Sequence, residues 1–423
     1  MALDRSKAPE FNIPSDFELI TPTTLNLDSG LKFYFFKTPG IDAVKLEVIG
    51  KSARNRIPKE HVLIPSFTLQ MILEGTKDFS EEELSEFFDF HATEAQPVLS
   101  YTHEGLSLLS TKRHLEAILP RFISLFTQAT FPSESLEKRK SQRRLSLKLE
   151  KEKSSSRSSQ LFRTALFGAE HLYGQEVNEE HIDLITSDML IDYYLNHLWQ
   201  DCEIFLSGDL DYSQLNFLSK WLEIIPSKRM VYERLDQPGI ITLKIHEERK
   251  DALQSSLRIG NWSISKSHSD YHGLSIFNTI LGGYFGSRLV KNIREDKGHT
   301  YGINSSLVEL GEYNYWVIGA DVQKAYLNEV IQEVYAEIDR LSTELVSEEE
   351  LEILRNYLIG QLLSRFSSSF DLMDRFKAVH HSGLDLSYYQ RKLDYLKKVT
   401  PQDLLRIGQT YFSAHPFVEV SVG

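Results

Sequence analysis

Short stretches of alternating apolar and polar residues recur along the chain, and longer stretches between them repeat every three to four residues. The first pattern predicts β-strands and the second predicts helices with one apolar face. In the first half the predicted strands are "LKFYFFKT", "AVKLEVIGK", "GLSLLSTK" and "CEIFLSG". In the second half they are "GIITLKIHEE", "ALQSSLRIGNW", "TYGINSSLVEL", "YNYWVIGADV" and "FVEVSVG". Several strands follow one another without an intervening helix, which predicts hairpins and an α+β fold with helices covering one face of each mainly antiparallel sheet.

Capping residues predict where several helices begin. Ser80 and Ser347 each precede a glutamate at capping-box spacing, and Thr400 is followed by a proline at the first helical position. A core-facing stripe is predicted on "KAYLNEVIQEVYAEIDRLS", formed by Tyr326, Val330, Val334 and Ile338. The serine-rich run 154–159 is interpreted as a turn between two helices of the same half.

The two halves of the chain repeat one another at a fixed distance. "FPSESLEKRK" begins at Phe131 and "VSEEELEILR" begins at Val346, an offset of 215 residues. The aspartates of "ITSDML" and "VTPQDLL" keep this offset, as do the glycines that end "IFLSG" and "VEVSVG". A shared offset over three landmarks predicts two copies of one αβ unit of roughly 200 residues each.

The boundary between the copies is predicted where a helical pattern gives way to proline and glycine. Pro226, Pro238 and Gly239 interrupt the stretch "EIIPSKRMVYERLDQPG". The expected units are an N-terminal domain, a linker and a C-terminal domain, over residues 1–225, 226–238 and 239–423.

Composition and charge narrow the class of protein. With 423 residues, of which 41% are hydrophobic and 25% charged, the chain matches an ordinary two-domain globular protein. Its formal net charge of −13 argues against nucleic-acid binding, which requires a basic face, and favours basic or neutral partners. No apolar run approaches the roughly 20 residues of a membrane span, and the N-terminus has no apolar signal-peptide segment. We expect a cytoplasmic protein whose single Cys202 is a small buried core residue.

The second half contains a motif with a specific spacing. A glycine-rich turn, "LGGYFGSRL", leads into "NIREDKGHTYG", which sets Arg294 and Tyr301 seven residues apart and Gly298 at an expected helix C-cap. Taken singly, Arg294 is also typical of an exposed helix C-terminus and Tyr301 of a half-buried strand position. With this motif and its duplicated αβ unit, the chain resembles, over nearly its whole length, the pitrilysin/insulinase family of zinc peptidases, which includes mitochondrial processing peptidase. The resemblance implies two homologous domains that close like a clamshell over a peptide.

The zinc-binding motif of that family is lost from the first half. "EGTKDFSEEEL" matches the family's Gly-Thr and the following helix start at Gly75 and Thr76. Counting back, the family's His-x-x-Glu-His falls on "SFTLQ", so its histidines become Ser66 and Gln70 and its catalytic glutamate becomes Leu69. A catalytic zinc needs three protein ligands and a carboxylate that takes the proton of water. We therefore expect no metal and no other cofactor on this chain, and no independent peptidase activity.

The rest of the sequence offers no complete ligand set. The family's downstream glutamate falls near Ser146 or Leu147, with Glu150 left as an alternative. Histidines beside carboxylates do not follow the spacing of a zinc-binding helix and are interpreted as structural residues; they are His91, His103, His171, His181, His380 and His381. The basic run "KRKSQRRLSLKLEK" is interpreted as a solvated helix face because glutamates interleave it.

The resemblance also implies a function for the remaining pair. In two-chain members of the family, one subunit holds the zinc motif and the other supplies only the arginine and the tyrosine. We expect this chain to be that second subunit, in a heterodimer with a zinc-bearing chain of similar size. Tyr301 would donate to the oxyanion, and Arg294 would hold a carbonyl or carboxylate of an unfolded peptide that adds as a strand to a sheet edge. The alternatives are an inactive structural or binding pseudo-peptidase, and an autonomous peptidase with an unrecognised metal site.

Overall fold

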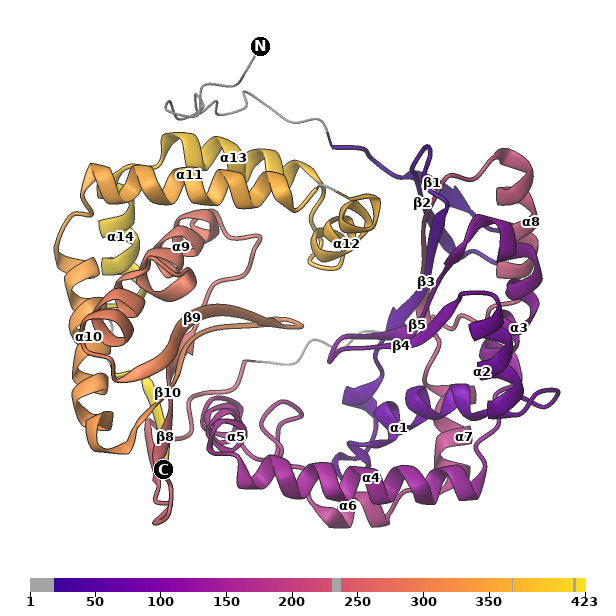
Figure 1. The fold of residues 1–423 in the computed structure, drawn as a ribbon, viewed down its shortest axis with the longest axis horizontal. Helices are drawn as coiled ribbons and strands as arrows, with labels where there is room; N and C mark the ends of the chain where they lie inside the picture. Colours follow the sequence, from indigo (N-terminus) through magenta and orange to yellow (C-terminus); the bar gives the residue numbers. More distant parts are fainter. Residues whose placement is uncertain (1–18, 230–236, 367, 414–415) are drawn as a thin grey trace, which may run out of the picture.

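Two β-sheets, each covered by helices, face one another across the molecule like the halves of a clamshell (Figure 1). The structure, a computed structural model, describes residues 19–229, 237–366, 368–413 and 416–423. The predicted α+β fold is confirmed. Part of the predicted linker, residues 230–236, lies outside the described residues, as does the N-terminal segment 1–18. No helix in the described part of the chain combines the length and the apolar character that crossing a bilayer requires.

The first sheet has six strands in the order β1-β2-β6-β3-β5-β4. Its neighbours pair antiparallel except β2 and β6, which are parallel. The strands are β1 (Thr23–Asn26), β2 (Lys32–Lys37), β3 (Ala43–Lys51), β4 (Glu94–Leu99), β5 (His103–Thr111) and β6 (Gln200–Gly208). β4 is therefore an edge strand.

The second sheet repeats this order with five strands, β7-β11-β8-β10-β9. Again only the pair from the start and the end of the half, β7 and β11, is parallel. The strands are β7 (Lys244–Glu247), β8 (Gln254–Trp262), β9 (Thr300–Leu310), β10 (Tyr313–Gln323) and β11 (Val418–Val422). The order β2-β6-β3-β5-β4 in the first sheet matches the order β7-β11-β8-β10-β9 in the second. This match supports the predicted duplication and makes β9 the counterpart of β4.

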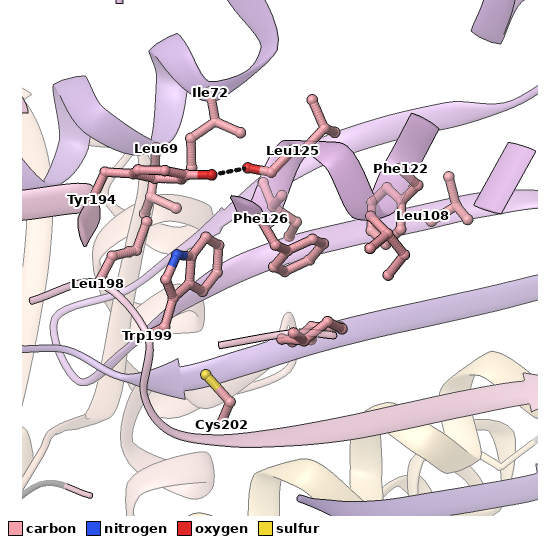
Figure 2. Close-up of a cluster of buried hydrophobic side chains, with 14 of the residues drawn as sticks. Leu69, Ile72, Leu108, Phe122, Leu125, Phe126, Tyr194, Leu198, Trp199 and Cys202 are labelled. Carbon is pink, nitrogen blue, oxygen red and sulfur yellow. Dashed lines mark hydrogen bonds between the residues drawn. The ribbon is translucent and has the colours of Figure 1, made fainter. Parts of the chain in front are cut away.

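Helices pack on the sheets in both halves (Figure 1). The first half contains α1 (Ile64–Met71), α2 (Glu81–Phe90), α3 (Leu115–Thr127), α4 (Ser133–Glu152), α5 (Ser154–Phe167), α6 (Glu179–Asp183), α7 (Ser187–Asn196) and α8 (Tyr212–Leu222). The second half contains α9 (Tyr271–Asn278), α10 (Leu327–Thr343), α11 (Glu348–Ser364), α12 (Ser369–His380), α13 (Ser387–Lys398) and α14 (Pro401–Tyr411). Aromatic and aliphatic side chains from α1, α3 and α7 fill the core of the first half, where Cys202 is buried as predicted (Figure 2).

The halves exchange one helix each. α5 of the first half packs its apolar side chains, among them Phe162 and Phe167, against Tyr313 and Tyr315 of the second sheet. In the same way α12 of the second half covers the face of the first sheet that points toward the second half (Figure 1). The two helices begin 215 residues apart, at Ser154 and Ser369, which is the offset of the duplication. The halves are thus joined by reciprocal packing.

This exchange corrects one prediction. The serine run 154–159 is no turn but the first turns of α5, which crosses onto the opposite sheet. Small side chains let the helix approach closely, because the fully buried Ser158 hydroxyl pairs with the Ser256 hydroxyl of β8 at 2.9 Å. The serines serve close packing between the halves rather than chain reversal.

Most other local predictions hold. The capping boxes at Ser80 and Thr400 are present, and the Ser347 hydroxyl accepts the first-turn amide of α11. Tyr326 departs from the predicted core stripe, since it precedes α10, is 40% exposed and stacks on His299. The edge strand β4 went unpredicted because Pro97 interrupts its strand pattern.

Candidate functional site

Helix α1 matches the helix that would hold zinc in the resembled family, but its side chains are buried in the core or exposed at the surface and none is a zinc ligand. α1 starts with Pro65 in its first turn and presents Leu69 inward, where that side chain is fully buried among the residues of Figure 2. The Ser66 hydroxyl donates to the Leu63 carbonyl of its own helix at 2.8 Å, and Gln70 is exposed. None of these three side chains offers a carboxylate, an imidazole or a thiolate to a metal.

The predicted third ligand is replaced as well. On α4, Leu147 is buried in the core, and the Ser146 hydroxyl donates to Glu150 at 3.0 Å. Glu150 is engaged by both guanidinium nitrogens of Arg143, at 2.7 and 3.3 Å. Burial alone would raise the pKa of Glu150, but these hydrogen bonds outweigh it and hold the pKa below its usual value. The remaining carboxylate is therefore neutralised by an arginine.

The histidines singled out in the sequence have structural contacts. His91 bonds the Phe87 carbonyl, His171 lies against Tyr313, and His181 accepts the Asn178 amide. His103, His380 and His381 gather with Glu203 between α12 and the first sheet. In the described ranges no group of three or more His, Cys, Asp or Glu side chains is arranged to hold a metal ion.

A cavity of about 500 Å³ lies against α1 where the catalytic centre would be. Ser66 and Gln70 form one side, and Leu99 and Tyr101, at and after the end of β4, form another. The tip of the β9–β10 hairpin closes it from the second half, with residues 309–311. The two hairpin tips that follow the edge strands thus meet at this cavity.

Arg294 lies elsewhere, in a π-helical segment, Val290–Asp296, rather than the ordinary helix its sequence predicts. The predicted Gly298 follows with φ of +65°, a left-handed conformation that ends the segment. The Arg294 guanidinium lies 4.9 Å from the ring centre of Phe285, which comes from the glycine-rich turn and is itself exposed. In the described chain no carboxylate forms an ion pair with Arg294, so its hydrogen-bond donors remain available.

Tyr301 occupies a bulge at the start of β9. Thr300 pairs with Val322 and Ile303 with Ala320, so two residues of β9, Tyr301 and Gly302, oppose a single residue of β10. Bulges re-aim side chains and are frequent at sheet edges beside active sites. Tyr301 is 88% exposed, which overturns the alternative of a half-buried strand tyrosine.

The pair is remote from the cavity at α1. β9 meets that cavity with Glu309 and Leu310, at the opposite end of the strand from Tyr301. At about 3.3 Å per strand residue, roughly 25 Å separates the two ends. The structure therefore does not bring Arg294 and Tyr301 together with Ser66, Leu69 and Gln70.

Known proteins are similar to this chain in sequence and in fold. Residues 185–358 match the family model described as the peptidase M16 inactive domain. YmxG of Bacillus subtilis, described as an uncharacterized zinc protease, is 25% identical to this chain over 82% of it and 85% of YmxG. In sequence the chain is thus similar to M16 peptidases. Its resemblance to pitrilysin/insulinase-type peptidases is thereby confirmed.

Further relatives agree with an M16 chain that lacks the zinc ligands. YmfF of Bacillus subtilis, named a probable inactive metalloprotease, is 21% identical over 57% of this chain and 58% of YmfF. A crystal structure of a peptidase M16 inactive domain from Pseudomonas fluorescens shares the fold with a TM-score of 0.84 at 21% identity, covering 96% of this chain and 98% of that one. A chain of complex III2 from Candida albicans shares it with a TM-score of 0.73 at 12% identity, covering 95% of each.

Proposed function

We propose that this chain is the non-catalytic subunit of a two-chain zinc peptidase, supplying Arg294 and Tyr301 to a zinc site held by a partner of similar size. The observation that carries the proposal is the placement of the pair. Both side chains are exposed, neither lines this chain's own α1 cavity, and Tyr301 lies roughly 25 Å from that cavity along β9. A pair placed for catalysis there has to act on groups that come from another molecule.

The chemistry of the pair fits such a role. The Tyr301 hydroxyl can donate a hydrogen bond to the oxyanion that forms when a peptide carbonyl is attacked. The Arg294 guanidinium, oriented by its stacking on Phe285, can hold a carbonyl or carboxylate of the substrate with its planar fork of donors. The partner's zinc would supply the activated water.

The substrate of this proposed enzyme is an unfolded peptide. β4 and β9 are edge strands, and both border the inner side of the clamshell (Figure 1). An extended peptide can add to such an edge through main-chain hydrogen bonds, whereas a folded protein has no free strand to offer. In this proposal the edge strands accept a peptide because it is extended, whatever its sequence.

The proposal is tested by reconstituting the chain with a zinc-bearing M16 chain and measuring peptide cleavage. Tyr301→Phe should lower kcat by about 100- to 1000-fold, the cost of losing one oxyanion donor, while complex formation is unchanged. Tyr212→Phe is the matched control, because Tyr212 on α8 is 86% exposed and lies outside the pair. Unchanged turnover of the Tyr301 variant would remove the pair from catalysis.

A second candidate is a pseudo-peptidase that only binds partners. The conversion of Leu69 into a core residue favours it, because nothing on α1 retains a catalytic task. This candidate predicts that the assembly is stable without any zinc-bearing relative and that Arg294 and Tyr301 can be replaced without effect.

A further inference from the structure

A second cavity, of about 620 Å³, adjoins the one at α1 and is strongly basic. It lies between α4, α5, the segment after α5 and β8 of the second half, and it shares Arg54, Ser66, Tyr101 and Arg143 with the α1 cavity. Six basic and two acidic side chains line it. The basic ones are Arg54, Arg143, Lys151, Arg157, Arg163 and Arg258, and the acidic ones are Glu150 and Glu176. A basic cavity is unexpected in a chain whose net charge is −13.

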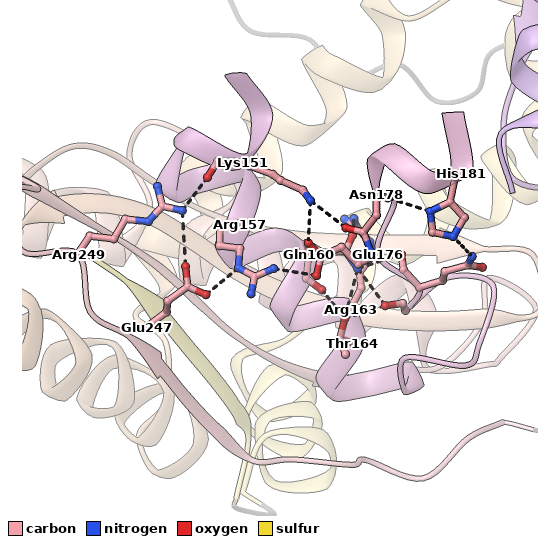
Figure 3. A network of polar contacts seen from close by, with 12 residues as sticks. Lys151, Arg157, Gln160, Arg163, Thr164, Glu176, Asn178, His181, Glu247 and Arg249 are labelled. Carbon is pink, nitrogen blue, oxygen red and sulfur yellow. Dashed lines mark hydrogen bonds and ion pairs between the residues drawn. The ribbon is translucent and has the colours of Figure 1, made fainter. Parts of the chain in front are cut away.

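Two of these arginines are neutralised within the protein. Arg143 is held by Glu150. Arg157 bridges Glu176 at 3.0 Å and Glu247 of β7 at 2.7 Å, in the network that ties α5 to the second sheet (Figure 3). These ion pairs explain the two arginines as structural residues.

Three others have no carboxylate partner in the described chain: Arg54, Arg163 and Arg258. Arg163 donates to the Gln160 side chain at 2.6 Å, and its Nε is buried without an acceptor. The Nε of Arg54 is also buried without an acceptor. Arg258 donates only to neutral oxygens, among them the Ser159 hydroxyl at 3.1 Å and the Leu257 carbonyl at 2.7 Å. Three guanidinium groups thus converge on one cavity with their charge uncompensated by ion pairs.

Burying these charges is costly unless an anion accompanies them. Burial lowers the pKa of Arg258, and only Asp321 opposes this from a distance. Arg54 lies in the field of Glu104, but burial raises the pKa of that carboxyl to about 7, so Glu104 is only partly ionised at neutral pH. A bound carboxylate would supply the missing negative charge and accept the free donors.

We propose that this cavity binds the carboxylate side chain of an acidic peptide through Arg54, Arg163 and Arg258. This inference rests on the proposed peptide-binding function and adds its substrate class. A peptide paired with β4 that continues past Leu99 reaches Tyr101, which borders both cavities, so the basic cavity lies in line with the edge strand. The volume is that of a small-ligand site, which holds one or two side chains.

The test is peptide binding by fluorescence anisotropy on the full chain at about 0.15 M salt. An unstructured labelled peptide with two glutamates is compared with the same peptide carrying two glutamines. The acidic peptide should bind at least about 10-fold more tightly, since each charge-assisted bond contributes about that factor. Arg163→Gln and Arg258→Gln should each remove most of this preference. Arg144→Gln should keep it, because Arg144 is on the same helix as Arg143 but pairs with Asp183 outside the cavity.

Other outcomes separate the two proposals. Equal affinity for both peptides would overturn the acidic specificity and leave peptide binding intact. Binding of inorganic phosphate as tight as that of the acidic peptide would also overturn it, because the cavity would then be a site for small anions. Binding of neither peptide, to the chain alone or to its complex with the zinc-bearing partner, would overturn the proposed function together with this inference.

Discussion

The imidazole rings of His103 and His381 stack face to face, with their centres 3.8 Å apart and their planes within 10°. His103 belongs to β5 of the first sheet, and His381 directly follows α12 of the second half. Beside them His380 contacts Glu203 of β6 at 2.9 Å. A titratable contact therefore joins the exchanged helix α12 to the opposite sheet.

Acid should weaken this contact. Burial lowers the pKa of His103 to about 4, with Lys51 and His380 adding to the effect and Glu203 opposing it. Burial, His103, His380 and Lys377 lower the pKa of His381 to about 3. The unfolded chain binds these protons near pH 6.5, so the stabilisation is complete above about pH 6.5 and is lost as the pH falls toward 4. We expect a loss on the order of 3 kcal/mol per histidine in the free energy of unfolding between pH 7 and pH 4, measured by urea denaturation.

His103→Phe isolates that contribution, because it keeps a stacked ring that cannot titrate. Relative to the wild type, the variant should gain stability as the pH is lowered from 7 to 4. The same substitution of His61, in the surface turn Lys59–His61, should leave the pH profile unchanged. A constant difference between His103→Phe and the wild type at all pH values would contradict the assignment.

Glu104→Gln should have the opposite pH dependence. Burial raises the pKa of Glu104 to about 7 although Tyr193 donates to it at 2.5 Å and Ser52 at 3.3 Å. The stabilisation by its protonated form is complete below about pH 4.5 and is lost as the pH rises through 7. The variant should therefore gain on the order of 2 kcal/mol over the wild type between pH 5 and pH 8. The exposed Glu81→Gln is the control. An identical difference in unfolding free energy between Glu104→Gln and the wild type at both pH values would contradict the raised pKa of Glu104.

Leu69→Ala should cost about 2–5 kcal/mol of unfolding free energy, because the side chain is fully buried in the core of the first half. Gln70→Ala, the next residue on α1, is exposed and should change stability by less than about 0.5 kcal/mol. Thermal denaturation of both variants measures the contrast. Similar values for the two would contradict an α1 helix that buries Leu69 and exposes Gln70.

Gly260→Ala should disrupt the packing of α5 on the second sheet. A Cβ at this position would lie 2.1 Å from the Trp316 carbonyl oxygen and 2.8 Å from the Phe162 ring of α5. We expect a loss of about 1–3 kcal/mol or more from this overpacking. Gly302→Ala has open space around its Cβ and should be nearly neutral. Proteolysis near α5 that rises only in the Gly260 variant would locate the damage, and equal sensitivity of the two would contradict the close approach.

Much of the fold follows from local signals. The alternation in "AVKLEVIGK" predicts β3 with its observed bounds, and the offset of 215 residues predicts a duplication that the sheet orders and the starts of α5 and α12 also show. These succeed because strand periodicity and duplication are properties of the sequence itself. The loss of zinc ligands at Ser66 and Gln70 is equally visible in the sequence, since it is found by counting back from Gly75 and Thr76 to the positions of the family's histidines.

Features that depend on distant contacts were missed. The exchange of α5 and α12 places apolar faces against sheets about 100 residues or more away, which no local pattern records. The run containing Arg143 is interpreted in the sequence as a solvated face, yet Arg143 lines a cavity to which β8 of the second half contributes Arg258. The run holds four lysines and three arginines, so its composition does not mark the cavity, which becomes visible only in the three-dimensional arrangement.

The proposed two-chain peptidase requires a zinc-bearing partner, so the most direct measurement is the composition of the assembly isolated gently from cells that express this chain. Mass spectrometry and zinc analysis should find a second M16 chain of similar size with an intact His-x-x-Glu-His motif in equal amount, and about one zinc ion per pair of chains. Isolation of the chain alone, or with unrelated proteins and without zinc, would contradict the proposed two-chain peptidase and favour the pseudo-peptidase.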